Sequence, residues 1–219
     1  MVLPGRGAEC DRARAVTAAR QGMMAAVTGQ IRRAAGRDIA TISESLARAF
    51  EDDPVMAWVF PEVASRRSRL ARFFAVAAAT MLPRGEIWTS GGGESAAIWA
   101  PPGRWRAPLL EGVRMAPIVG ARAPLLLRGF RNVERNHPRW PHWYLSVLGT
   151  DPPAQGRGLG SAVMEPVLSR CDEQGLGAYL ESSKESNVPY YRHHGFEVVD
   201  VATLLRGPRL WLMWRHPRS

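Results

Sequence analysis

The stretch "DPPAQGRGLGSAVM" (Asp151–Met164) is the most unusual part of the sequence, and the fold can be argued from it. Three of its glycines fall within five residues, between a strand-like apolar run, "HWYLSVLGT", and a helix-like one. Glycine allows positive φ angles and close approach of the backbone to a ligand. The first N–H groups of a helix lack partners and bind phosphate. The stretch therefore favours a phosphate-binding turn, although a glycine cluster alone is more often a plain tight turn.

Two familiar phosphate loops do not fit this turn. A dinucleotide fingerprint, G-x-G-x-x-G, would need a glycine where Ser161 stands, and it usually lies in the first strand–helix unit of a chain. A P-loop would need a lysine after its last glycine, and none follows here. The pattern that does fit is Q/R-x-x-G-x-G/A, which runs from Gln155 to Gly160.

Composition and charge bound the class of protein. The chain has 219 residues, 46% hydrophobic and 22% charged, which is typical of one globular domain with an extension. The net charge is +9, but the arginines are spread along the chain, so we expect a solvated basic surface and no nucleic-acid partner. No apolar run is long enough to span a membrane, and the two cysteines and five histidines lack metal-binding spacing. We expect a cytoplasmic protein with no membrane partner and no metal.

The order of predicted elements is typical of an α/β protein. We expect a flexible extension at residues 1–25 and a single domain at 26–219. Periodicity predicts a strand at 26–34, a helix at 36–54 stopped by Pro54, a helix at 65–82 and a hairpin around three glycines at 91–93. Residues 101–141 interrupt this order with two short helices. Strands at 143–150 and 177–183, joined by a helix, should be parallel, and two more strands end the chain.

On these residues the chain resembles the GNAT superfamily of acetyl-CoA-dependent N-acetyltransferases. The turn is followed by "YLESSKESN", "YYRHHGF" and a final pair of strands, in the order of that family. The resemblance covers residues 142–216 clearly and 30–106 more weakly, and it looks closest to the puromycin N-acetyltransferase-like branch. It implies an α/β (α+β) fold, with a GNAT-like mixed, centrally splayed β-sheet, helices on both faces and a helical insertion at about 101–141.

The resemblance also implies a site for acetyl-CoA. In the family, the strand before the glycine turn is bulged, and the pantetheine arm lies in the resulting cleft. Leu148, Gly149 and Thr150 would face the thioester and pantetheine with their backbone. Asn187 would contact pantetheine, with a helix cap as the alternative role. The residues around the pyrophosphate would be Gln155, Gly156, Arg157, Gly158, Leu159, Gly160 and Ser161.

Two catalytic residues are implied in the same way. Tyr191, in the family pattern Y-x-x-x-G-F, would protonate the leaving thiolate, because a phenol is protonated at neutral pH. Glu181 is the first candidate for the general base, and a strand carboxylate paired with an arginine is an equal alternative. His142 and Glu51 are weaker candidates. No Ser-His-Asp or Cys-His arrangement is evident, so we expect direct attack in a ternary complex.

The expected acceptor is the primary amine of a small molecule, with antibiotics and aminonucleosides among the candidates. Asp52 and Asp53 could attract a cationic amine, although such a pair is more often a solvated helix end. Residues 101–141 are expected to cover the acceptor as a lid, and a homodimer is a fair expectation. A protein-amine acetyltransferase and a non-catalytic acyl-CoA-binding sensor domain remain as alternatives.

Overall fold

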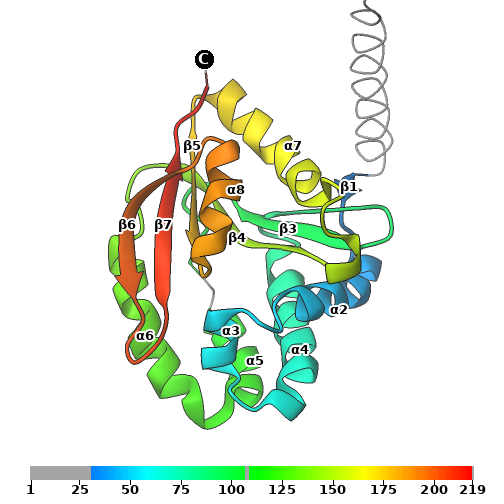
Figure 1. Cartoon of the computed structure of the whole chain (residues 1–219), viewed down its shortest axis with the longest axis vertical. Coiled ribbons are helices and arrows are strands. Elements are labelled where there is room, and N and C mark those ends of the chain that lie inside the picture. The colour runs from blue at the N-terminus through cyan, green and yellow to red at the C-terminus, as the bar shows by residue number, and fades with distance from the viewer. Residues whose placement is uncertain (1–30, 107–108, 219) are drawn as a thin grey trace, which may run out of the picture.

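A mixed sheet of seven strands forms the centre of the protein, in a computed structural model that describes residues 31–106 and 109–218 (Figure 1). The strand order is β1-β2-β3-β4-β5-β7-β6, and within this sheet the β4–β5 pair is parallel while the other pairs are antiparallel. The strands are β1 (Arg32–Arg33), β2 (Glu86–Thr89), β3 (Ser95–Ala100), β4 (His142–Thr150), β5 (Gly177–Ser182), β6 (Glu197–Thr203) and β7 (Arg209–Arg215).

Helices cover both faces of the sheet, each face over its own apolar core (Figure 1). Side chains alternate between the two faces along a strand, so Leu180 lies in one core and its neighbour Tyr179 in the other. The Tyr179 core lies against α2 (Ile39–Ala49), α3 (Pro54–Val59), α4 (Val63–Met81), α5 (Leu109–Val119) and α6 (Ala123–Asn136). The Leu180 core lies against α7 (Leu159–Gln174) and α8 (Val188–His193). The predicted fold class is confirmed.

Most of the predicted elements are confirmed, but one prediction about a proline is wrong. The β2–β3 hairpin, the parallel β4–β5 pair and the final antiparallel pair are all present. Helix α2 ends at Ala49, however, and Pro54 is the first residue of α3, for which Asp53 is the N-cap. Proline suits this position because the first N–H of a helix has no intrahelical partner. The extension at 1–25 and most of the strand predicted at 26–34 lie outside the described residues.

The segment 101–141 is built into the domain core. It forms α5 and α6, joined by a 3-10 turn at Gly120–Arg122. Ile118, Val119, Leu126 and Val133 are buried in the same core as the α2 and α4 side chains. Removing the whole segment would therefore expose apolar core.

The sheet opens between β4 and β5. Pairing of these two strands ends at Leu145 and Leu180. At the same level the β3–β4 register shifts, because Ile98 pairs with Val147 but Trp99 pairs with Leu145, which leaves Ser146 as an extra residue. A β-bulge of this kind bends the strand and interrupts its pairing. Residues 146–150 of β4 therefore diverge from β5, and the sheet is splayed at its centre.

Candidate active site

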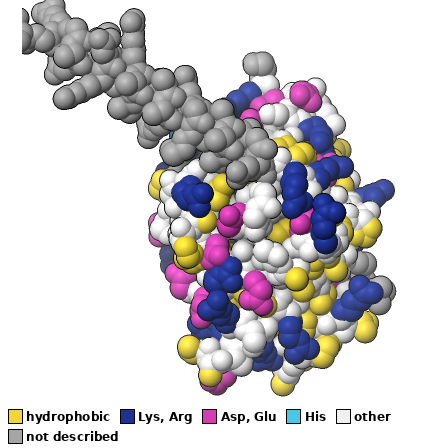
Figure 2. Space-filling view, turned by 90° about the vertical axis from the view of Figure 1, so that its right-hand side faces the viewer, with side chains coloured by type: hydrophobic (Ala, Val, Ile, Leu, Met, Phe, Trp, Pro, Cys, Tyr) yellow, Lys and Arg dark blue, Asp and Glu magenta, His cyan; other side chains and the backbone are white. Residues whose placement is uncertain are grey.

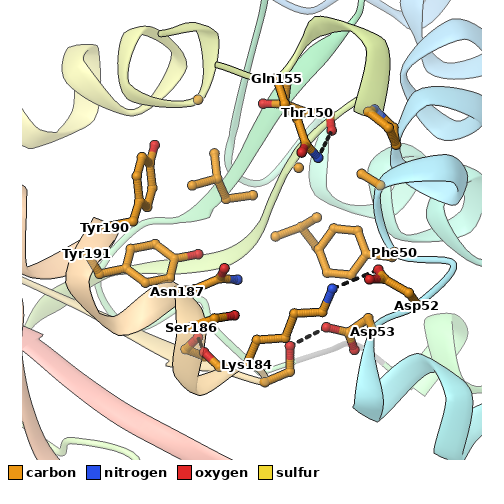
Figure 3. Close-up of a pocket in the computed structure, with 18 of the residues that line it drawn as sticks. Phe50, Asp52, Asp53, Thr150, Gln155, Lys184, Ser186, Asn187, Tyr190 and Tyr191 are labelled. Carbon is orange, nitrogen blue, oxygen red and sulfur yellow. Dashed lines mark hydrogen bonds and ion pairs between the residues drawn. The ribbon is translucent and has the colours of Figure 1, made fainter. Parts of the chain in front are cut away.

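The diverging strands border a cleft with a volume of about 1030 Å³ (Figure 3). This is at the upper end of the range of small-molecule and cofactor sites, about 300–1,000 Å³. Its walls come from β4 beyond the bulge, the glycine turn, the end of β5, α8 and the loop between α2 and α3. All of the predicted cofactor-binding and catalytic residues line this cleft except Arg157 and the weaker base candidate His142.

The glycine turn ends in a helix start without a side-chain cap. Gly156 and Gly158 have φ angles of 73° and 78°, a region that favours glycine. Gly158 is the N-cap of α7, which has no capping side chain and no acidic residue in its first turn. The first N–H groups of α7 are thus left for a ligand, and their partial positive charge favours an anion.

Two side chains brace the turn from outside. Arg48 of α2 makes a bidentate pair with Asp151, with Nε–Oδ1 and Nη2–Oδ2 distances of 2.8 and 2.6 Å. This hydrogen-bonded pairing lowers the pKa of the Asp151 carboxyl. Gln155 donates from Nε2 to the Thr150 carbonyl at 3.1 Å. The turn is therefore fixed to both α2 and β4, and the Gln155 side chain serves as a brace.

Tyr191 and Asn187 extend into the cleft from the segment after β5 (Figure 3). Among the described residues, the Tyr191 hydroxyl makes no hydrogen bond, and burial raises the pKa of this phenol, which keeps it protonated. Asn187 stands at the N-cap of α8 but makes no side-chain cap bond, so the alternative role as a cap is not realised. Both polar groups are free to meet a ligand.

Arg157 lies apart from the other predicted residues. It is absent from the cleft wall. The pKa of Glu94 in the β2–β3 hairpin is lowered first by a hydrogen bond from Ser90, and further by the charge of Arg157. The guanidinium therefore acts towards the hairpin and not towards the cleft.

Glu181 lies where β5 leaves β4, and its carboxylate is held by groups other than an arginine. Tyr144 donates its hydroxyl to Oε2 at 2.5 Å, and Nδ1 of His137 lies 3.6 Å from Oε1. Burial first, and the Glu181 charge second, raise the pKa of the Tyr144 phenol well above its ordinary value. Tyr144 is thus a fixed donor to Glu181, whose side chain is only 10% exposed.

The two aspartates after α2 have different roles. Asp53 is buried and caps α3 by accepting from the N–H groups of Val55 and Met56 at 2.9 and 3.0 Å. Ser183 also donates to it, and burial raises its pKa. Asp52 is exposed and pairs with Lys184 across the cleft at 2.7 Å (Figure 3). The loop after α2 is therefore tied to the loop after β5 at two points.

The sequence analysis did not predict three residues that support the site: Arg48, Tyr144 and His137. Arg48 and Asp151 are 103 positions apart, and Tyr144 and Glu181 are 37 apart, so no local pattern connects them. His142, a weaker base candidate, lies behind His137 and away from the cleft wall. The position of Tyr144 two residues before the bulge is the one local signal that could have identified it.

Two kinds of site are absent from the residues that the structure describes. No group of three or more His, Cys, Asp or Glu side chains in residues 31–106 and 109–218 could hold a metal ion. In the same part of the chain, no helix is both long and apolar enough to cross a bilayer.

Comparison with known proteins agrees with this geometry. Residues 129–196 match the family model described as Acetyltransferase (GNAT) family. An uncharacterised N-acetyltransferase of Schizosaccharomyces pombe is 27% identical over 208 residues, which cover 86% of this chain and 83% of the relative.

Two solved structures share the fold. A Corynebacterium glutamicum structure, described as histone acetyltransferase HPA2 and related acetyltransferase, superposes with a TM-score of 0.67 at 23% identity, over 87% of this chain and 97% of the other. The polyamine N-acetyltransferase of Drosophila melanogaster gives a TM-score of 0.54 at 16% identity, over 85% and 98% of the two chains. The matched segment contains the glycine turn, Glu181 and Tyr191. Residues 129–196 are therefore similar to GNAT acetyltransferases, and the chain shares the fold of the solved acetyltransferases.

Proposed function

We propose that the protein transfers an acetyl group from acetyl-CoA to the primary amine of a small molecule, by direct attack within a ternary complex. One observation carries the proposal. A single cleft joins an uncapped helix start, a phenol without a partner and a carboxylate held by a phenol. These are the groups needed to bind a pyrophosphate, protonate a thiolate and deprotonate an amine.

The residues present fit acetyl-CoA. The N–H groups at the start of α7 would hold the pyrophosphate. The positive φ angles of Gly156 and Gly158 would strain any residue that carries a Cβ. The backbone of Leu148, Gly149 and Thr150, which has left β5, would pair with the pantetheine arm, and Asn187 would contact it from the other wall. Acetyl-CoA supplies the activated acetyl group when bound.

The residues of the chain then divide the proton transfers. Glu181 takes a proton from the acceptor ammonium, so that the neutral amine can attack the thioester carbonyl. Backbone N–H groups of β4 beyond the bulge donate to the carbonyl oxygen as its negative charge develops. The Tyr191 hydroxyl donates its proton to the sulfur that leaves.

The finer features of the proposal rest on separate observations. Glu51 is an exposed carboxylate on the cleft wall, which suits a cationic acceptor, whereas Asp52 is already paired with Lys184. An antibiotic or aminonucleoside acceptor follows only from the resemblance to the puromycin N-acetyltransferase-like branch. A homodimer is supported by the position of β6 at the sheet edge, where Val199 and Val201 are 58% and 44% exposed. A cytoplasmic location rests on composition alone.

The test is acetyl-CoA binding and amine-dependent thiol release, with a panel of amines that includes puromycin. We expect Tyr191→Phe to lower kcat by about 100-fold or more, since general acid catalysis contributes 10²–10⁴-fold. Tyr190→Phe is the matched control, because that hydroxyl faces Ser161 at 3.4 Å, and its kcat should fall far less. Failure to bind acetyl-CoA would refute the proposal. Binding without turnover would favour a sensor, and turnover of peptides alone would favour a protein acetyltransferase.

A further inference from the structure

A row of polar groups runs from Glu181 away from the cleft. Nδ1 of His137 lies 3.6 Å from Glu181 Oε1, and Nε2 of His137 lies 3.0 Å from Nε2 of His142. Nδ1 of His142 lies 2.7 Å from the Trp140 carbonyl oxygen. His137 is 3% exposed and stacks on Trp105, with ring centroids 3.7 Å apart. Both nitrogens of this ring therefore have fixed neighbours.

The protons in this row can be assigned from the chemistry of its end. A carbonyl oxygen only accepts, so Nδ1 of His142 carries a proton. Burial lowers the pKa of His142, which favours its neutral ring and leaves its Nε2 as an acceptor. Nε2 of His137 must then be the donor between the two rings. The Nδ1 atom of His137, which faces Glu181, is left as the one position that can gain or lose a proton.

We propose that His137 receives, through Glu181, the proton removed from the acceptor amine. This rests on the proposed function, in which Glu181 is the base. An N–H bond of the ammonium breaks and an Oε1–H bond forms on Glu181. That bond then breaks as an Nδ1–H bond forms on His137, and no electrons are gained or lost. The pair ends as a carboxylate beside an imidazolium, so Glu181 regains its charge during the reaction.

The surroundings of His137 suit a proton that is taken up and released again. Glu181 favours the imidazolium, and the other titratable groups against the ring are His142, Tyr144 and Tyr179. His137 and Trp105 also border a second cavity of about 600 Å³. Its other charged side chains are Arg106, Arg131, Arg135, Arg139 and Glu134, a net positive set that opposes the imidazolium. The ring therefore lies between an acidic group on the Glu181 side and a mainly basic set around the second cavity.

Trp105 and His137 both belong to the segment 101–141, so this segment brings His137 close to the Glu181 carboxylate. The 3.6 Å gap is longer than a hydrogen bond. Hydrogen bonds of catalytic groups commonly tighten when substrate binds, so this gap is compatible with transfer.

The test compares kcat–pH profiles of the wild type, His137→Phe and His137→Gln at saturating acetyl-CoA and amine. Phenylalanine keeps a flat ring against Trp105, and glutamine keeps a hydrogen-bond donor for Glu181, but neither takes up a proton. We expect both to lower the plateau by on the order of 10- to 100-fold. Reference imidazole and carboxyl groups titrate about 2 pH units apart. The acid limb of the kcat–pH profile should therefore lie at lower pH in both His137 variants than in the wild type, by on the order of 1–2 units. His193→Gln is the control for loss of an exposed histidine.

A merely structural role gives a different result. It predicts an acid limb at the wild-type pH and recovery of activity in the glutamine variant, and either outcome would overturn the proposal. Thermal unfolding of each variant separates loss of fold from loss of transfer, and the glutamine variant serves if the phenylalanine variant does not fold. Glu181→Gln tests the underlying assignment. If Glu181→Gln keeps the wild-type kcat, Glu181 is not the base. If Glu181→Gln loses most of its kcat but the pH profiles of the His137 variants are not shifted, only the proposed role of His137 is refuted.

Discussion

Helix α7 offers a matched pair of glycines that separates ligand binding from backbone strain. Gly158 at its N-cap and Gly175 at its C-cap have φ angles of 78° and 63°. At neither position would a Cβ meet another atom within 4 Å. Alanine at either site therefore brings the same penalty for a left-handed backbone, about 1–2 kcal/mol. For a chain of this size, each kcal/mol lowers Tm by about 2–4 °C.

Only Gly158 borders the cleft, so only its replacement should affect acetyl-CoA. Alanine relieves its strain by rotating the adjacent peptides, which turns an N–H of the turn away from the pyrophosphate. A hydrogen bond to a charged group is worth about 1.5–3 kcal/mol, so Gly158→Ala should raise the Kd by about 10- to 150-fold. Gly175→Ala should leave the Kd within about twofold, because Gly175 does not border the cleft.

The assay is calorimetric titration of both variants with acetyl-CoA at one salt concentration, beside thermal unfolding. Similar losses of Tm with a selective loss of affinity in Gly158→Ala would support the pyrophosphate site. Equal Kd values for the two variants would refute the reasoning, because the turn would then be a plain tight turn.

Three further predictions follow from other contacts. Because Arg48 holds the pKa of Asp151 below its ordinary value, this pair contributes stability that is full above the usual aspartate range and is lost as pH falls through the lowered pKa. Tm measured from pH 6 to pH 2 should therefore fall less in Arg48→Met than in the wild type, and parallel curves would contradict this. Burial raises the pKa of Cys171 to about 12, so with the other cysteine replaced by serine the native protein should not react with a thiol reagent at pH 8, and fast reaction would contradict its burial. A Cβ at Gly177 would lie 2.0 Å from Cζ2 of Trp214, so Gly177→Ala should destabilise the protein by about 1–3 kcal/mol in denaturant unfolding, and an unchanged midpoint would argue against this contact.

The sequence predicted those parts of the site that depend on neighbouring residues. The glycine turn, the strands on either side of it and the Y-x-x-x-G-F segment each carry their signal within about ten residues, and each lies where it was expected. Pro54 shows the limit of such local signals. Proline is compatible with both the end of one helix and the first turn of the next, and only the N-cap bonds of Asp53 decide between them.

The environment of Glu181 could not be predicted in the same way. An arginine partner was an equal expectation in a chain rich in arginine, but Tyr144 and His137 hold the carboxylate. Which side chain reaches it depends on the parallel register of β4 on β5 and on the path of the chain after α6. Neither is encoded in the residues around position 181. Arg157 is a similar case, because its charge acts on Glu94 of the β2–β3 hairpin, which is distant in the sequence.

The fork in the sheet explains how the proposed base, Glu181, can border the cleft and yet be held in place. Leu180 is the last residue of β5 that pairs with β4, so Glu181 is the first residue beyond the fork. One residue earlier, the side chain of Leu180 packs into the apolar core on the α7 and α8 face of the sheet. Further on, β5 would have diverged from the β4 side chains that hold the carboxylate. At the fork itself, the Glu181 side chain borders the cleft and still accepts a hydrogen bond from Tyr144. Tyr144 belongs to the part of β4 that precedes the bulge and pairs with β5. The bulge at Ser146 therefore opens the binding cleft and also sets the place on β5 where a carboxylate can be both accessible and fixed.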